Sequence, residues 1–153
     1  MYYTAKLDDW LVESGMLDLA PCASEVDLAI AIDLRESIYD LVAACLDGRP
    51  MPTEAVAELN LQASGLPVTL RLGPHGMTRT GSVAQGLAAL AREMIVIVGG
   101  DDGALLRECA RPECTQVYLD RSRGRRREWC AMKTCGNRVK AAAYRARQHV
   151  SQG

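Results

Sequence analysis

Four of the six cysteines lie in the last 45 residues of the chain, and their spacing is its clearest chemical signal. They form two C-x4-C pairs separated by 15 residues, at Cys109, Cys114, Cys130 and Cys135. Two close cysteine pairs joined by a short segment are typical of a structural tetrathiolate zinc site. Four sulfurs complete a tetrahedron around Zn²⁺ and leave no position for a catalytic water. We therefore expect a structural zinc ion and no enzymatic activity.

The segment that carries these cysteines has little apolar material from which to build a core. Its main bulky apolar side chains are Val117, Tyr118, Leu119 and Trp129, too few for a segment of this size to fold unaided. A structural zinc ion contributes about 10–16 kcal/mol of folding free energy in comparable sites. The spacing leaves two alternatives open, namely four unligated thiols or two disulfides. Disulfides would require an oxidising compartment.

An arginine-rich run separates the two cysteine pairs. Residues 121–127 read R-S-R-G-R-R-R, five arginines in seven residues, and we expect them at the tip of a hairpin. Guanidinium groups bind phosphate oxygens in a bidentate manner, and a basic helix is expected over about 137–148. The predicted phosphate contacts are Arg121, Arg123, Arg125, Arg126 and Arg127 in the run, and Arg138, Lys140, Arg145 and Arg147 on the helix. The alternative is a charged loop that only contacts solvent.

The net charge of −1 conceals a strong division along the chain. Residues 1–108 hold 7 Lys and Arg against 16 Asp and Glu, a net charge of −9, whereas residues 109–153 hold 11 against 3, a net charge of +8. A basic segment of this kind favours a polyanionic partner, with DNA as the first choice. Two further hypotheses are a module that binds an acidic protein surface, including the acidic half of the chain itself, and a zinc-thiolate redox switch.

The elements that must position these groups are mostly helices. Apolar residues recur with the period of a helix in four segments, opened by Thr4, Ser24, Thr53 and Ser82 and ending near Gly15, Gly48, Ser64 and Gly99. Apolar and polar residues alternate on either side of Gly73-Pro74-His75-Gly76, which predicts a β-hairpin within about 67–80. A last short helix is expected over 103–108, capped by Asp101 and Asp102.

The predicted fold class is α+β and mainly α-helical, in two domains. Residues 1–105 would form an acidic helical domain with one hairpin, and residues 106–153 a basic zinc finger in which a β-hairpin precedes a helix. In the first domain Arg35 falls on an apolar helix stripe, four residues before Tyr39. Such an arginine commonly covers apolar surface or pairs with a carboxylate. The sharper hypothesis is an anion-binding group in the pocket of a small-molecule effector.

The carboxy-terminal segment resembles the CGNR zinc finger, which takes its name from the residues found here at Cys135 to Arg138. The resemblance covers about Leu106 to Arg147, through C-A-R-P-E-C, Y-L-D-R-S-R and W-C-A-M-K-T-C-G-N-R-V-K-A-A-A-Y-R. Residues 1–105 resemble, more loosely, the helical ABATE domain that precedes this finger in bacterial proteins described as stress-induced transcription regulators. The resemblance implies zinc held by the four cysteines and DNA bound by the finger. The first domain would then sense a ligand or mediate homo-oligomer formation.

Composition and hydropathy bear on where the protein works. Hydrophobic residues are 48% and charged residues 24% of the chain, values typical of a globular protein. The longest strongly apolar run, Met94 to Val98, has five residues, whereas a membrane helix needs about 20. The first residues lack the basic and apolar regions of a secretory signal. We expect a cytoplasmic protein without a membrane partner.

Overall fold

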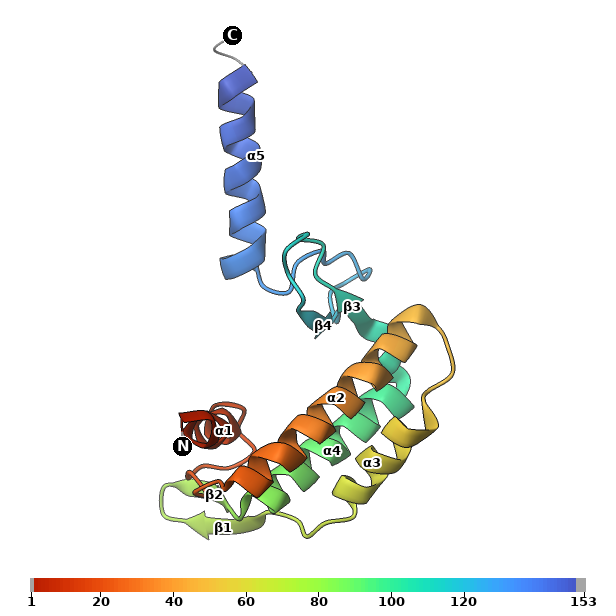
Figure 1. Cartoon of the computed structure of the whole chain (residues 1–153). Helices are drawn as coiled ribbons and strands as arrows, with labels where there is room; N and C mark the ends of the chain where they lie inside the picture. The colour runs from red at the N-terminus through yellow and green to blue at the C-terminus, as the bar shows by residue number, and fades with distance from the viewer. Residues whose placement is uncertain (1, 151–153) are drawn as a thin grey trace. The chain divides into compact units, whose positions relative to one another are not determined.

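The computed structural model describes residues 2–150, and the chain forms two compact units. Unit 1 is Met1–Gly100 and unit 2 is Asp101–Gly153. Unit 1 contains helices α1 (Tyr2–Glu13), α2 (Glu25–Asp47), α3 (Thr53–Ala63) and α4 (Val83–Gly99), with a hairpin of β1 (Thr69–Gly73) and β2 (Gly76–Thr80). In Figure 1, α2, α3 and α4 lie alongside one another. The four predicted helices, the hairpin and the α+β, mainly helical class are confirmed.

Two of the predicted helix starts are confirmed by complete capping boxes. The Ser24 hydroxyl accepts from the Asp27 N–H at 3.2 Å, and the Asp27 carboxylate accepts from the Ser24 N–H at 2.9 Å. Ser82 and Gln85 exchange the same pair of bonds at the start of α4. These bonds satisfy N–H groups that have no partner within the helix. The first residues of each helix therefore fix where it begins.

The other two predicted starts are wrong. Helix α1 begins at Tyr2, so Thr4 lies within the helix and is buried rather than capping it. Helix α3 is preceded by Pro52, whose backbone is extended and which makes no side-chain capping bond. Because the proline ring already fixes φ near the required value, Thr53 becomes the first helical residue instead of the cap.

The core of unit 1 joins α1 to the other helices. Leu11 and Leu17 are fully buried, as are Leu34 and Leu41 of α2. Helix α4 approaches closely at Gly86, where a Cβ atom would lie 2.9 Å from Leu11 Cδ2 and 3.5 Å from Leu17 Cδ1. Glycine suits that position, because a Cβ atom would press against the buried Leu11 side chain and force it to shift.

We expect Leu11→Ala to destabilise unit 1 by about 2–5 kcal/mol, because it leaves a cavity at a fully buried site. Thermal and urea unfolding followed by circular dichroism measure the change. Val12→Ala, on the exposed side of the same helix, is the matched control and should cost far less. A loss of bound metal in Leu11→Ala would contradict the independence of the two units.

The hairpin of unit 1 is antiparallel, with Leu70 opposite Arg79 and Leu72 opposite Met77. The segment after α1 holds it in place. The Asp18 N–H donates to the Arg79 carbonyl at 2.9 Å, and the Arg79 N–H donates to the Asp18 carboxylate. This pair of bonds joins residues that are 61 positions apart in the chain.

Unit 2 differs from the sequence expectation in its strands. A 3-10 turn, η1 (Asp101–Leu105), leads into β3 (Leu106–Glu108), so the helix expected over 103–108 is wrong. Strand β3 pairs antiparallel with β4 (Val117–Leu119), placing buried Leu106 opposite Leu119. Since β-branched and aromatic residues favour a strand, the segment Val117-Tyr118-Leu119 forms a strand, and the preceding segment pairs with it.

This pairing moves the arginine run away from the expected hairpin tip. The hairpin encloses the first cysteine pair, and residues 121–127 form a loop after β4. A π-helical turn, η2 (Met132–Gly136), then continues directly into the predicted helix, α5 (Asn137–Val150). Across residues 2–150, no helix has both the length and the apolar composition needed to cross a membrane.

Candidate metal centre

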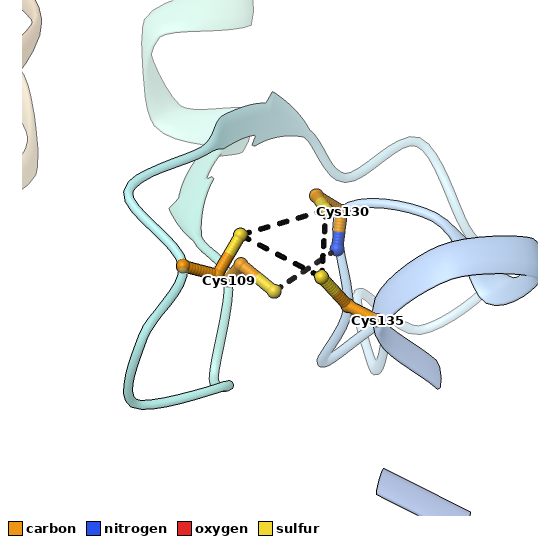
Figure 2. A group of neighbouring side chains, drawn as sticks. Cys109, Cys130 and Cys135 are labelled. Carbon is orange, nitrogen blue, oxygen red and sulfur yellow. Dashed lines mark hydrogen bonds between the residues drawn. The ribbon is translucent and has the colours of Figure 1, made fainter. Parts of the chain in front are cut away.

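The four cysteines come from four places in unit 2. Cys109 follows β3, Cys114 lies in the turn before β4, Cys130 follows the arginine loop, and Cys135 belongs to η2. All four sulfurs lie within 4.8 Å of one another. The Sγ···Sγ distances are 3.9 Å for Cys114–Cys130, 3.5 Å for Cys130–Cys135 and 3.6 Å for Cys114–Cys135. Figure 2 shows the sulfurs of Cys109, Cys130 and Cys135 turned toward one another.

These distances fit a metal ion and exclude disulfides. A tetrahedral ion with Zn–S bonds of about 2.3 Å places its ligand sulfurs about 3.8 Å apart. A disulfide would bring two sulfurs to about 2.05 Å, and all six cysteines of the chain are free. The four cysteines form a zinc-finger-type site, as predicted, in which each cysteine can supply one sulfur ligand.

The pKa values of two of the thiols reflect how closely the four sulfurs are packed. Burial raises the pKa of Cys109, but N–H groups of Arg111 and Cys130 and the neighbouring thiols outweigh it and lower the pKa to about 6. Burial and the other three thiols raise the pKa of Cys135 to about 12. One thiol therefore loses its proton readily, and the negative charge that results disfavours deprotonation of a second thiol. A divalent cation would offset this repulsion, and metal binding requires deprotonated sulfurs.

Arg111 also fits a negatively charged metal-thiolate site. Its Nε is buried and has no hydrogen-bond partner within residues 2–150. Its positive charge acts to lower the pKa of Cys135, against the larger effects of burial and the neighbouring thiols. Four thiolates around Zn²⁺ carry a net charge of −2, which would provide Arg111 with its counter-charge. The sequence analysis missed this residue, although a basic residue within a C-x4-C turn is visible in the sequence.

Gly136 is required by the packing next to the site. A Cβ atom there would lie 2.5 Å from Met132 Sδ and 3.1 Å from Trp129 Cδ1. Its N–H donates to the Ala131 carbonyl at 3.1 Å. Glycine therefore allows η2 to fold tightly against Trp129 while Cys135 faces the other sulfurs.

A buried carboxylate organises the arginine loop. Asp120 is fully buried, and its Oδ1 accepts from the Ser122 hydroxyl at 2.6 Å and from the Ser122 N–H at 3.0 Å. Its Oδ2 accepts from the Arg127 N–H at 3.2 Å. The two ends of the loop are thus held by one side chain. The sequence analysis missed Asp120, for which the available signal was an aspartate two residues before a serine at the end of a strand.

Two of the predicted phosphate contacts already have partners within unit 2. The Arg127 guanidinium donates to the Trp129 carbonyl at 2.7 Å and to the Cys130 carbonyl, and it stacks 4.6 Å from the ring centroid of Tyr118. Arg121 pairs with Asp102 at 2.6 Å. Arg127 therefore braces the second cysteine pair, and Arg121 joins the loop to η1.

The remaining arginines of the loop are Arg123, Arg125 and Arg126. All three are exposed, and no side chain or backbone group among the described residues pairs with their guanidinium groups. On α5, Arg138, Lys140, Arg145 and Arg147 are exposed as well. The structure thus offers these seven cations to a partner.

Comparison with protein families agrees with this geometry. The CGNR zinc finger family matches residues 106–148. The ABATE family, described as "Putative stress-induced transcription regulator", matches residues 4–101, which is more than half of the chain. The chain belongs to the ABATE family. A comparison with curated proteins finds no match.

Arg35 lies in the ABATE-matched part of the chain, on the wall of an open cavity of about 690 Å³. Its guanidinium also forms an ion pair with Glu36, with Nε 3.0 Å and Nη2 2.5 Å from Oε1. Both side chains are exposed. The expected pairing with a carboxylate is therefore present, and the anion-binding role of Arg35 stays a prediction.

Proposed function

We propose that this ABATE protein is a cytoplasmic bacterial transcription regulator that binds DNA through unit 2. The observation that carries the proposal is the exposure of Arg123, Arg125 and Arg126 on a loop whose ends are fixed by buried Asp120. A loop that is fixed at both ends loses less backbone freedom on binding than a mobile loop does, which lowers the entropy cost. Guanidinium groups are well suited to phosphate oxygens because they bind them in a bidentate manner.

The charge of unit 2 supports the same conclusion. Residues 101–153 hold 12 Lys and Arg against 6 Asp and Glu, a net charge of +6. Phosphate contacts of this kind provide affinity and orientation but little base recognition. In this proposal the zinc ion is structural, and the protein has no enzymatic role, because four thiolates complete the coordination of the metal.

For unit 1 we propose a sensing or oligomerising role. It carries no comparable basic surface, since residues 1–100 hold 6 Lys and Arg against 13 Asp and Glu, a net charge of −7. An acidic surface is repelled by DNA, so unit 1 would stay off the duplex and act on unit 2 instead.

The salt dependence of DNA binding tests the proposed function. If about five phosphates are engaged, log K should fall with log[salt] with a slope near −4.5, or roughly 500-fold between about 50 and 200 mM salt. Fluorescence anisotropy with a short labelled duplex measures it. The triple variant Arg123→Gln/Arg125→Gln/Arg126→Gln should reduce the slope to about −1.8.

Arg49→Gln/Arg71→Gln, which removes two exposed arginines from unit 1, is the control and should leave the slope unchanged. Absence of binding at low salt by zinc-loaded protein would overturn the proposal. Binding with an unchanged slope in the triple variant would place the interface away from the arginine loop.

A further inference from the structure

The cavity that contains Arg35 is an open groove between three helices of unit 1. Its wall is formed by Tyr3, Lys6 and Trp10 of α1, by Ile32 and Arg35 of α2, and by residues of α4. Buried Leu7 and Leu87 lie at its base. Its volume of about 690 Å³ falls within the range of about 300–1,000 Å³ found for sites of small organic ligands.

The rim of the groove exposes apolar groups that a monomer would ordinarily cover. Tyr3 is 67% exposed, Trp10 42% and Ile32 41%. Contiguous exposed apolar surface of this kind marks a binding site more often than isolated exposed residues do. Aromatic and branched side chains at one rim favour a ligand with an apolar chain or ring.

The charged residues of the groove indicate the charge of the polar end of the ligand. Unit 1 has only 6 Lys and Arg among its 100 residues against 13 Asp and Glu. Two of these cations, Lys6 and Arg35, line the groove, whereas none of its lining residues, all of which the structure describes, is Asp or Glu. The lining of the groove thus combines apolar side chains with two basic ones, although unit 1 as a whole is strongly acidic.

We propose that the groove binds a small amphipathic organic anion, with its apolar part against Trp10 and Ile32 and its carboxylate at Arg35 and Lys6. The surface pair of Arg35 with Glu36 does not prevent this, because an ion pair between two exposed side chains contributes little and rearranges easily. The ligand carboxylate would replace that of Glu36 as the partner of Arg35. The proposal extends the sensing role proposed for unit 1, but binding of the anion is tested separately from that role and from DNA binding.

Calorimetric titration of the full chain with decanoate, without DNA, tests the proposal. Decan-1-ol and decylamine present the same apolar chain without charge and with a positive charge. We expect decanoate to bind about tenfold more tightly than the alcohol, the effect of one charge-assisted hydrogen bond. The amine should bind more weakly still.

Four variants separate recognition from folding. Arg35→Gln should remove the preference for decanoate, Arg35→Lys should retain part of it, and Glu36→Gln should strengthen decanoate binding by removing the competing carboxylate. Arg71→Gln, which removes an exposed arginine outside the groove, should change nothing. Circular dichroism checks that each variant is folded. A merely structural role of Arg35 would not make Glu36→Gln bind more tightly.

Three outcomes would overturn the proposal: no binding of decanoate at millimolar concentration, equal binding of all three probes, or a dimer in light scattering that excludes decanoate from the groove. The last outcome would assign the groove to a second copy of the chain. If decanoate binds but leaves the affinity for DNA unchanged, the site stands and the sensing role is refuted. If decanoate binds and DNA does not, the proposed DNA binding alone fails.

Discussion

Replacement of Cys135 by serine should unfold unit 2 and leave unit 1 folded. Cys135 is buried, and its sulfur lies 3.5 and 3.6 Å from those of Cys130 and Cys114. A structural zinc site contributes about 10–16 kcal/mol, whereas a segment of this size supplies no more than about 3–5 kcal/mol from its core. Loss of one ligand therefore removes more stability than unit 2 possesses without the metal.

Metal analysis of the purified variant and an amide NMR spectrum measure the effect. The variant should lose its zinc, and the amide signals of residues 101–150 should collapse while those of α2 and α4 keep their dispersion. Cys22→Ser is the matched control, because Cys22 is an exposed free thiol in unit 1. Chelation of zinc from the unaltered protein should reproduce the change. A metal-free protein with an ordered unit 2 would refute the role assigned to the four cysteines.

Asp120→Ala should weaken DNA binding although it removes a negative charge. The substitution leaves the hydroxyl and N–H of Ser122 and the N–H of Arg127 without their acceptor. A hydrogen bond to a charged group contributes about 1.5–3 kcal/mol, so the ends of the arginine loop should separate when these bonds are lost. Arg123, Arg125 and Arg126 would then have to be ordered on binding, which lowers affinity.

Glu128→Ala is the matched control, because it removes the same charge from an exposed position close to the loop. That variant should bind DNA slightly more tightly, by simple electrostatics. Anisotropy measures both affinities, and hydrogen exchange at Ser122 and Arg127 reports the loosening. Equal gains in affinity for the two variants would show that Asp120 does not position the loop.

The carboxyl group of Asp120 is also expected to stay ionised throughout the neutral range. The hydrogen bond from the Ser122 hydroxyl, with further bonds from the N–H groups of Ser122 and Arg127, lowers the pKa of Asp120 despite its burial. A lowered folded-state pKa means that this stabilisation is complete above the unfolded-state value and is lost only as the pH falls through the folded-state value. Changes in DNA binding near neutral pH should therefore not arise from Asp120.

Features that depend on a few neighbouring residues could be predicted before the structure was known. The capping boxes at Ser24 and Ser82 involve residues three positions apart, so the starts of α2 and α4 were predictable. The zinc site was predictable for a related reason. Thiolates in close pairs have few alternatives to a shared metal in a segment too small for its own core.

The roles of the charged side chains could not be predicted, because they depend on contacts that form only when the chain is folded. Arg126 and Arg127 are neighbours in the same run and both are exposed, yet Arg127 contacts Tyr118 and the Cys130 carbonyl, whereas no group of the described residues pairs with the Arg126 guanidinium. The strand partner of Val117–Leu119 likewise depended on the burial of Leu106. Arg35 could be placed on a helix stripe from the sequence, but the groove beside it exists only because α1, α2 and α4 meet there.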